Sequence, residues 1–240
     1  MEQSQNKLKL VGILAAGGSG TRLGLEGGKQ LLEILGKPVA AWSLDSLARS
    51  ASIDELIVVC DPSRVPEYTA ALLPHLETEK GVSFIAGGES RQDSVFAGLL
   101  AAQELEADIV VIHDGARPLL KSAELDEAIQ VFIDHQELEG LIFGHPVTDS
   151  LKRVRISDQK PVLIEQSLNR SEFYAVQTPQ IFETKTLFEA HEQAQSQGIL
   201  ATDDAALVEA LGRSVGIFEA ARYNIKVTLP EDVLLVESSL

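Results

Sequence analysis

The chain has 240 residues and a formal net charge of −16, with 45% hydrophobic and 23% charged residues. These values favour a globular protein with a sizeable core and exclude a disordered chain. The negative charge and the lack of a dense basic tract disfavour nucleic acid as a partner. The polar N-terminus leads into an apolar run that glycines soon break, which predicts no signal peptide, no membrane span and a cytoplasmic location. Cys60 is the single cysteine, so no disulfide can form within the chain.

Short runs rich in Val, Ile and Leu alternate with longer segments of helical pattern, as in βαβ units around a parallel sheet. The runs are almost continuously apolar, which is typical of strands covered by helices on both faces. We therefore predict an α/β fold: one domain of residues 1–240 with a Rossmann-like, mainly parallel sheet and helices on both of its faces. The expected strands are Leu10–Ala15, Leu56–Cys60, Val82–Ala86, Ile109–His113 and Leu141–Val147.

Helix signals lie between these strands. Pro38 opens the segment Val39–Arg49, and the Ser90/Asp93 pair forms a capping pattern before Asp93–Leu105. A further helix is expected after Thr202, with Asp203 and Asp204 in its first turn and Gly212 beyond its end. A last helix is expected from Thr228 onward.

Residues 149–166 depart from this pattern. They show strand-like alternation around a polar turn at residues 157–160 and no helical stripe. This predicts a projecting β-hairpin arm. Because a lone hairpin is marginally stable in water, a partner subunit is the simplest surface for it, and we expect a homodimer.

A glycine-rich loop follows the first strand, in the order Ala15-Ala16-Gly17-Gly18-Ser19-Gly20-Thr21-Arg22, and Lys29-Gln30 closes it. Such a loop lets backbone N–H groups approach a triphosphate while the two cations supply positive charge. For the glycines alone, a tight turn is the simpler interpretation. A P-loop requires a lysine after the last glycine, and none stands there, which disfavours a P-loop ATPase. A dinucleotide-binding fingerprint has a third glycine where this chain has Leu23, which disfavours NAD binding.

The loop and its Lys-Gln pair, with four later segments in the same order, resemble the 2-C-methyl-D-erythritol 4-phosphate cytidylyltransferases of the non-mevalonate isoprenoid pathway. The four segments are Gly87–Ser94, His113–Pro118, Gln177–Gln180 and Asn224–Thr228. The resemblance implies that the phosphate of a sugar alcohol attacks the α-phosphorus of CTP with Mg²⁺ as cofactor. The products would be 4-diphosphocytidyl-2-C-methyl-D-erythritol and pyrophosphate, and no protein nucleophile is needed.

The resemblance also assigns roles to individual residues. The catalytic group it implies is Arg22, Lys29, Arg170 and Lys226. The nucleotide-binding group is Ala15, Ala16, Gly17, Gly20, Gly88, Glu89 and Ser94, and the substrate-binding group is Asp114, Arg117, Ser150 and Thr178. Asp114 is also the candidate magnesium ligand, although a turn aspartate before Gly115 is an open alternative. Ser150, Arg170 and Thr178 match residues that reach the site from a neighbouring subunit's arm.

Three other interpretations stay open. A ribitol 5-phosphate cytidylyltransferase would share the loop and the arm, but Ala116 favours methylerythritol phosphate. Nucleotidylyltransferases for sugar 1-phosphates have a Lys-Pro pair in place of Lys29-Gln30. A catalytically inactive nucleotide-binding module would be expected to lose some of the four catalytic cations, and all are present. His113 ends a buried strand and is interpreted as structural.

The chain also departs from the usual family pattern, with Leu14 and Gly28 where prolines are frequent, Gly115 for alanine and Ser150 for threonine. Gly28 is expected to loosen the loop that carries Lys29, because glycine loses more conformational freedom on ordering.

Overall fold

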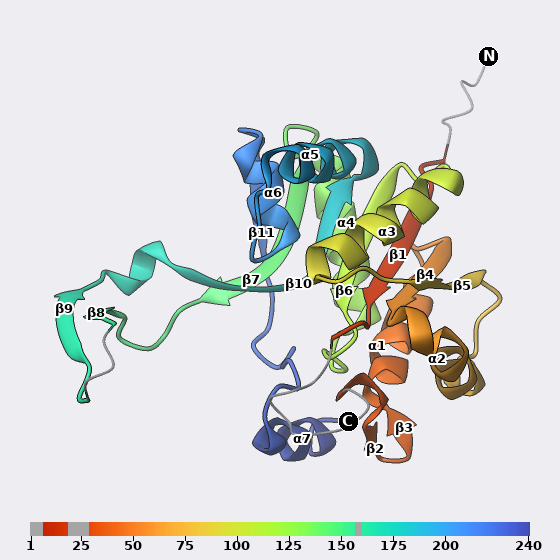
Figure 1. Ribbon diagram of the computed structural model, residues 1–240, viewed down its shortest axis with the longest axis horizontal. Coiled ribbons are helices and arrows are strands. Elements are labelled where there is room, and N and C mark those ends of the chain that lie inside the picture. Colours follow the sequence, from red (N-terminus) through yellow and green to blue (C-terminus); the bar gives the residue numbers. More distant parts are fainter. Residues whose placement is uncertain (1–6, 19–28, 157–159) are drawn as a thin grey trace.

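The computed structural model describes residues 7–18, 29–156 and 160–240. A central sheet crosses the body, helices lie on both of its faces, and a thin arm extends far to one side (Figure 1). Within these ranges no helix combines the length and the apolar character that crossing a bilayer demands.

The central sheet has seven strands in the order β11-β7-β10-β6-β1-β4-β5. They are β1 (Leu10–Ala15), β4 (Glu55–Cys60), β5 (Val82–Ala86), β6 (Ile109–Asp114), β7 (Gly140–Pro146), β10 (Tyr174–Glu183) and β11 (Val215–Glu219). All neighbouring pairs are parallel except those of β10, which runs antiparallel to β6 and β7. The predicted mainly parallel α/β sheet is confirmed. Strands β10 and β11 were not anticipated from the sequence.

Side chains of each buried strand alternate between two apolar cores. In β1, Leu10 and Leu14 face one core, whereas Val11 and Ile13 face the other. The first core is covered by α1 (Val39–Ala48), α2 (Val65–Leu72) and α4 (Ser122–Asp134). The second is covered by α3 (Arg91–Glu104), α5 (Thr184–Gln197) and α6 (Asp204–Ala210). Burial on both faces explains why the strands are apolar at successive positions.

The helix signals at the start of α3 are confirmed in detail. Ser90 caps the helix through a complete capping box with Asp93, so α3 begins at Arg91, before the expected Asp93. Asp203 caps α6 by accepting from the Ala206 N–H at 3.2 Å. Both helix starts lie on the same side of the sheet, and this brings Arg91 toward Asp204.

A small third core joins two segments that are distant in sequence. The short strands β2 (Glu33–Ile34) and β3 (Lys37–Pro38) form a hairpin, and α7 (Pro230–Glu237) lies beside it. Ile34, Val39, Leu119, Val227 and Val236 are buried together in this core. It ties the segment that carries Lys29 to the one that carries Lys226.

The arm is a two-stranded antiparallel sheet formed by β8 (Lys152–Arg155) and β9 (Leu163–Ser167). Every residue of both strands is exposed. The projecting hairpin of the predicted fold class is confirmed. Most of its expected turn, at residues 157–159, lies outside the described residues. The interpretation of residues 1–240 as one domain with an arm at 149–166 stays a prediction.

Candidate active site

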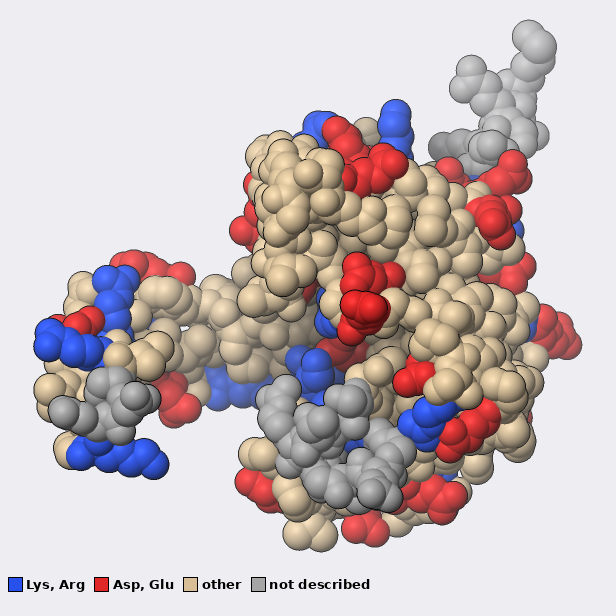
Figure 2. All heavy atoms as spheres, in the orientation of Figure 1, with Lys and Arg blue, Asp and Glu red and all other residues tan. Residues whose placement is uncertain are grey.

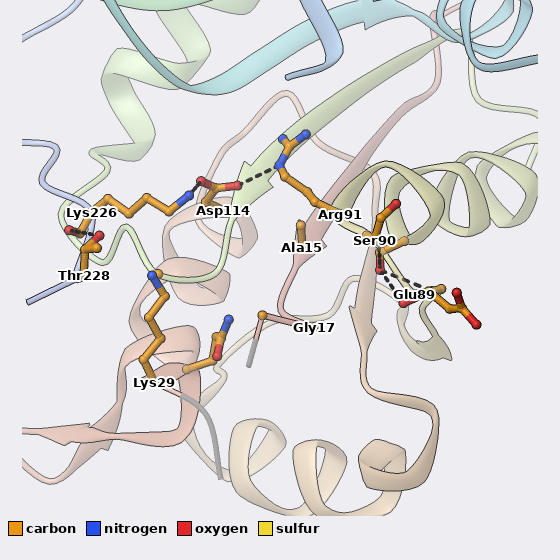
Figure 3. A pocket seen from close by; sticks show the side chains of 14 residues that line it. Ala15, Gly17, Lys29, Glu89, Ser90, Arg91, Asp114, Lys226 and Thr228 are labelled. Carbon is orange, nitrogen blue, oxygen red and sulfur yellow. Dashed lines mark hydrogen bonds and ion pairs between the residues drawn. The ribbon is translucent and has the colours of Figure 1, made fainter. Parts of the chain in front are cut away.

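A cavity of about 380 Å³ opens at the carboxyl ends of β1 and β6, where ligands gather in open α/β sheets. Figure 3 shows lysines on one side of this cavity and the start of α3 on the other. Figure 2 shows a hollow in the middle of the same face, with basic atoms at its edge and more on the arm. The lining residues are Ala15, Gly17, Gly18, Lys29, Gln30, Gly88, Glu89, Ser90, Arg91, Ser94, Asp114, Ala116, Lys226 and Thr228.

One wall is the beginning of the glycine-rich loop. Ala15 and Gly17 line the cavity, as predicted for nucleotide-binding residues, and Gly18 of the same loop lines it too. A Cβ on Gly18 would lie 2.8 Å from Gln30 Nε2, so the loop passes too close to Gln30 for a larger residue without a shift of that side chain. Ala16 differs from the prediction, because it is fully buried and its N–H donates to the Val59 carbonyl at 2.7 Å. That N–H is therefore not available to a triphosphate.

Lys29 begins a short 3-10 helix, η2 (Lys29–Leu31), and lines the cavity opposite Gly17 (Figure 3). Its predicted place beside a triphosphate agrees with this position. The predicted residues Gly20 and Arg22 lie outside the described residues.

The second wall is the turn before α3, which contains Gly88, Glu89 and Ser94. The Ser94 hydroxyl accepts from the Gly88 N–H at 3.2 Å and donates to the Ser90 carbonyl at 2.9 Å. A Cβ on Gly88 would lie 2.3 Å from the Asp93 Cβ, so only glycine fits this tight turn. Glu89 is exposed and its carboxylate points away from both lysines (Figure 3). Ser94 thus shapes the wall, and Gly88 leaves room beside it.

The floor is built around Asp114, the last residue of β6, whose side chain is 10% exposed. Lys226 Nζ donates to its Oδ2 at 2.5 Å, and Arg91 Nε donates to its Oδ1 at 3.4 Å. Burial by itself raises the pKa of a carboxyl group. Here the charges of Lys226 and Arg91 outweigh burial and hold the pKa of Asp114 well below its usual range. Asp114 is therefore ionised at neutral pH.

Beneath the floor, a chain of hydrogen bonds fixes the backbone of Asp114. The Asp114 N–H donates to Thr178 Oγ1 at 3.0 Å, and Thr178 Oγ1 lies 3.1 Å from His113 Nδ1. His113 Nε2 lies 3.1 Å from the Arg117 carbonyl, which can only accept, so Nε2 carries the proton and Nδ1 accepts from Thr178. Burial lowers the pKa of His113 to about 4. This neutral histidine is structural, as the sequence indicated.

This arrangement corrects the prediction for Thr178. We expected it to reach a neighbouring subunit's site from the arm, but it lies in the body of the chain and is 5% exposed. The reason is a register shift in β10 between Val176 and Gln180, which brings Thr178 beneath the end of β6. Its hydroxyl is occupied by Asp114 and His113, and it does not line the cavity.

Arg117 was expected to contact the acceptor phosphate directly, and the structure shows its contacts within the chain. Its side chain is 12% exposed, and Nη1 donates to the Asn224 carbonyl at 2.7 Å. Asn224 in turn donates to the Thr178 carbonyl at 2.8 Å. The Val227 N–H donates to the Ala116 carbonyl at 2.8 Å. In this conformation Arg117 braces the segment that presents Lys226, and its role as a phosphate ligand stays a prediction.

Ser150 and Arg170 lie away from this chain's own cavity. Ser150 is exposed just before β8, and Arg170 begins the exposed 3-10 helix η5 (Arg170–Glu172) at the base of the arm. Arg170 Nη1 donates to the Thr148 carbonyl. Neither residue lines the cavity, so within one chain the predicted catalytic cations do not all meet.

Comparison with known proteins matches residues 10–240 to the family model of IspD, 2-C-methyl-D-erythritol 4-phosphate cytidylyltransferase. A protein of that name from Bacillus cytotoxicus is 38% identical over 95% of this chain and 96% of its own length. Another, from Desulforamulus reducens, is 35% identical over 96% of this chain and 95% of its own. The chain belongs to this family.

A solved structure agrees with this membership. The crystal structure of the cytidylyltransferase from Thermus thermophilus has a TM-score of 0.75 and 29% identity, covering 96% of this chain and 98% of its own. The fold of that structure therefore recurs here over nearly the whole chain.

Six cavity residues of this family member were not among the individually predicted site residues: Gly18, Gln30, Ser90, Arg91, Ala116 and Thr228. Gln30 follows Lys29 and Arg91 follows Ser90, inside motifs that the sequence analysis had identified. Their position in these motifs could have indicated that they line the cavity. Thr228 follows Lys226 by two residues and donates its hydroxyl to the Lys226 carbonyl at 3.1 Å. Alternation along that extended segment could have indicated it.

Metal ligands are sparse in this member of the family. Among the described residues no group of three or more His, Cys, Asp or Glu side chains could hold a metal ion. Asp114 is the carboxylate on the cavity floor, and both of its oxygens face cations. Mg²⁺ commonly binds through one or two carboxylates together with substrate phosphates and water. A single carboxylate, Asp114, fits this kind of magnesium site and does not fit one built from protein ligands alone.

Proposed function

We propose that the chain transfers the cytidylyl group of CTP to 2-C-methyl-D-erythritol 4-phosphate, releasing pyrophosphate. The observation that carries the proposal is the cavity itself. In a family member with a net charge of −16, two lysines converge on a glycine-lined pocket at the ends of β1 and β6. A local concentration of cations in an acidic protein is what a triphosphate and a second phosphate need.

In the proposed step an oxygen of the acceptor phosphate bonds to the α-phosphorus of CTP. The bond from that phosphorus to the oxygen bridging to the β-phosphate breaks, and this oxygen leaves with the bonding electrons as part of pyrophosphate. The acceptor phosphate is already ionised near neutral pH, so no protein base is required. The protein aligns the two phosphates and neutralises charge on the transferring group.

The residues divide this work by position. Lys29, with the backbone at Gly17 and Gly18, would bind the triphosphate. Lys226 lies on the same side of the cavity as Lys29, beside Asp114, and would hold the acceptor phosphate in line. Arg22 is proposed, from its place in the glycine-rich loop, as a second cation on the triphosphate.

Magnesium is the proposed cofactor. Asp114 would hold it, together with phosphate oxygens and water, and Asp114 is kept ionised by Lys226 and Arg91. When bound, the ion supplies positive charge to the phosphates. A single carboxylate at the floor favours an ion that arrives with CTP over a permanent protein-held site.

We also propose that the enzyme is a homodimer whose arms complete each other's sites. The arm exposes Ile156, Leu163 and Ile164 at 94%, 61% and 64%, an apolar surface suited to burial against a second copy. Ser150 and Arg170 would then reach the partner's cavity. A cytoplasmic location, expected from the N-terminal sequence, stays a prediction.

The test is pyrophosphate release by purified protein with CTP and magnesium, comparing methylerythritol 4-phosphate with ribitol 5-phosphate. Release with the first acceptor and not the second is expected. Release with ribitol 5-phosphate alone would keep the chemistry and overturn the substrate. Silence with both acceptors would favour the inactive nucleotide-binding module.

A further inference from the structure

A buried carboxylate lies behind the wall of the cavity without lining it. Asp204, the first residue of α6, is 1% exposed, and its Oδ2 lies 2.8 Å from Arg91 Nη1. The same guanidinium donates through Nε to Asp114 Oδ1 at 3.4 Å. Arg91 therefore bridges a carboxylate on the cavity floor and a carboxylate in the core.

Other groups lie close to Asp204 on its remaining sides. Its N–H donates to Gln180 Oε1 at 3.2 Å, and its Oδ1 lies 3.3 Å from Nε2 of His191. The His191 ring is fully buried and stacks on Phe96 with 5.7 Å between ring centroids. The carboxylate also lies at the N-terminus of α6, where the helix dipole favours a negative charge. Asp204 is therefore a buried negative charge beside which the Arg91 guanidinium lies.

Four charged side chains are in contact in series, beginning with Asp204 and Arg91, continuing with Asp114 and ending with Lys226. Arg91 occupies Oδ1 of Asp114, and Lys226 occupies Oδ2. Without the charge of Asp204, the guanidinium would be attracted by Asp114 alone. It would compete with Lys226 for that carboxylate, because Arg91 can reach both oxygens with its planar fork of donors. The orientation of the Lys226 ammonium then depends on what holds Arg91.

We propose that Asp204 is a positioning residue for cytidylyl transfer: it holds Arg91 on Oδ1 of Asp114, which leaves Oδ2 to Lys226. This role rests on the proposed function. It concerns the acceptor side of the cavity, because Arg91 acts through Asp114 on Lys226, whereas Lys29 and the loop at Gly17 lie on another segment. A loss of Asp204 should therefore change the kinetics of the acceptor and leave those of CTP nearly unchanged.

The first test compares Asp204→Asn with Asp203→Asn. Both remove one negative charge from the start of α6, and asparagine still caps a helix at position 203, but only Asp204 contacts Arg91. For Asp204→Asn, kcat/KM for the acceptor is expected to fall between about tenfold and 100-fold, as for a small misplacement of a reacting group. KM for CTP should stay within about twofold. Asp203→Asn should stay within about twofold on both measures. Equal losses in the two variants would overturn the proposal.

The second test is a double-mutant cycle with Arg91→Gln. If Asp204 acts through Arg91, then Asp204→Asn should change acceptor kcat/KM by less than about twofold in the Arg91→Gln background. It should also raise the Tm of that background, because Arg91→Gln leaves Asp204 buried without its cation. The same fold loss in both backgrounds would overturn the proposal.

Two controls separate this role from a loss of structure or of function. A fall in kcat that follows the folded fraction, with KM unchanged for both substrates, would show that Asp204 only supports the fold. If Arg91→Gln does not fold, Arg91→Lys keeps the charge but lacks the fork, and the same cycle applies. A wild-type enzyme that releases no pyrophosphate would instead overturn the proposed function, and with it this role.

Discussion

The floor of the cavity and the arm differ in how their charged and apolar groups are satisfied. On the floor, Asp114 is buried and meets Lys226, Arg91 and Arg117 within the same chain. On the arm, β8 and β9 are exposed throughout, and their ion pair Arg155–Glu165 lies in solvent. The floor is complete in one chain. The arm leaves its apolar side chains exposed, and we propose that a second copy of the chain covers them.

The largest expected effect comes from removing the arm. Replacing residues 150–167 by a short Gly-Ser linker should abolish the dimer and lower kcat/KM by at least about 100-fold, as for the loss of a group that orients a substrate. The melting temperature of the body should change little, because the described residues of the arm belong to none of the three cores. Sedimentation, calorimetry and pyrophosphate release measure these outcomes. A monomer with full activity would refute the shared site.

A substitution of Asp114 on the cavity floor should lower the stability of the protein. Asp114→Asn removes the main counter-charge of Arg117 and Lys226, and we expect the free energy of unfolding to fall by about 3 kcal/mol. The matched control is Asp149→Asn, the same change at an exposed position beside the arm, which should stay within about 0.5 kcal/mol. Urea denaturation compares the two. Similar values for both would mean that the ionic floor contributes nothing particular to the fold.

The pH dependence of stability gives a smaller effect that again belongs to the body. The folded protein keeps His113 neutral down to a pKa of about 4, whereas the unfolded chain binds a proton near the ordinary value of 6.5. Stability should therefore be full above about pH 6.5 and fall as the pH drops toward 4, by about 2 kcal/mol between pH 7 and 5. The depressed pKa values of Asp114 and Asp204 act only at lower pH.

His113→Asn should remove most of this slope. The same substitution at the exposed His135 should keep it. Urea denaturation at several pH values distinguishes them, and an unchanged slope in His113→Asn would contradict the structural role of this histidine.

The sequence predicted best those strands of the body whose residues are apolar because both of their faces are buried. Strands β1, β4 and β6 were located to within a residue because helices cover both faces and make them almost continuously apolar. Strand β10 escaped because Gln177, Thr178 and Gln180 interrupt its apolar run. Thr178 and Gln180 are buried with their polar groups bound to distant ones, the Asp114 N–H and the Asp204 N–H. No local pattern reveals such partners.

The site divides in the same way. Motif positions predicted that Lys29, Gly88, Asp114 and Lys226 would meet, and all four line the cavity. They did not predict that Arg91 would link Asp114 to Asp204, since that contact depends on how α3 and α6 pack. Nor did they predict that Thr178 would bind the Asp114 N–H, or that Arg117 would bind the Asn224 carbonyl, inside the body. Contacts between side chains from distant segments depend on tertiary packing, so a single sequence contains little information that predicts them.

The most direct test of the account is complementation between two inactive variants. Lys29→Ala damages the cavity of the body, and Arg170→Ala damages the arm. Loss of a single charge donor to a transferring group costs about 2.7–4 kcal/mol of barrier, so each variant alone should retain little activity. In an equimolar mixture that exchanges subunits, one site in each heterodimer has both residues intact. Activity should then recover to about a quarter of the wild-type value, as a two-fold symmetric dimer requires. A mixture no more active than the sum of its parts, although heterodimers form, would contradict the account.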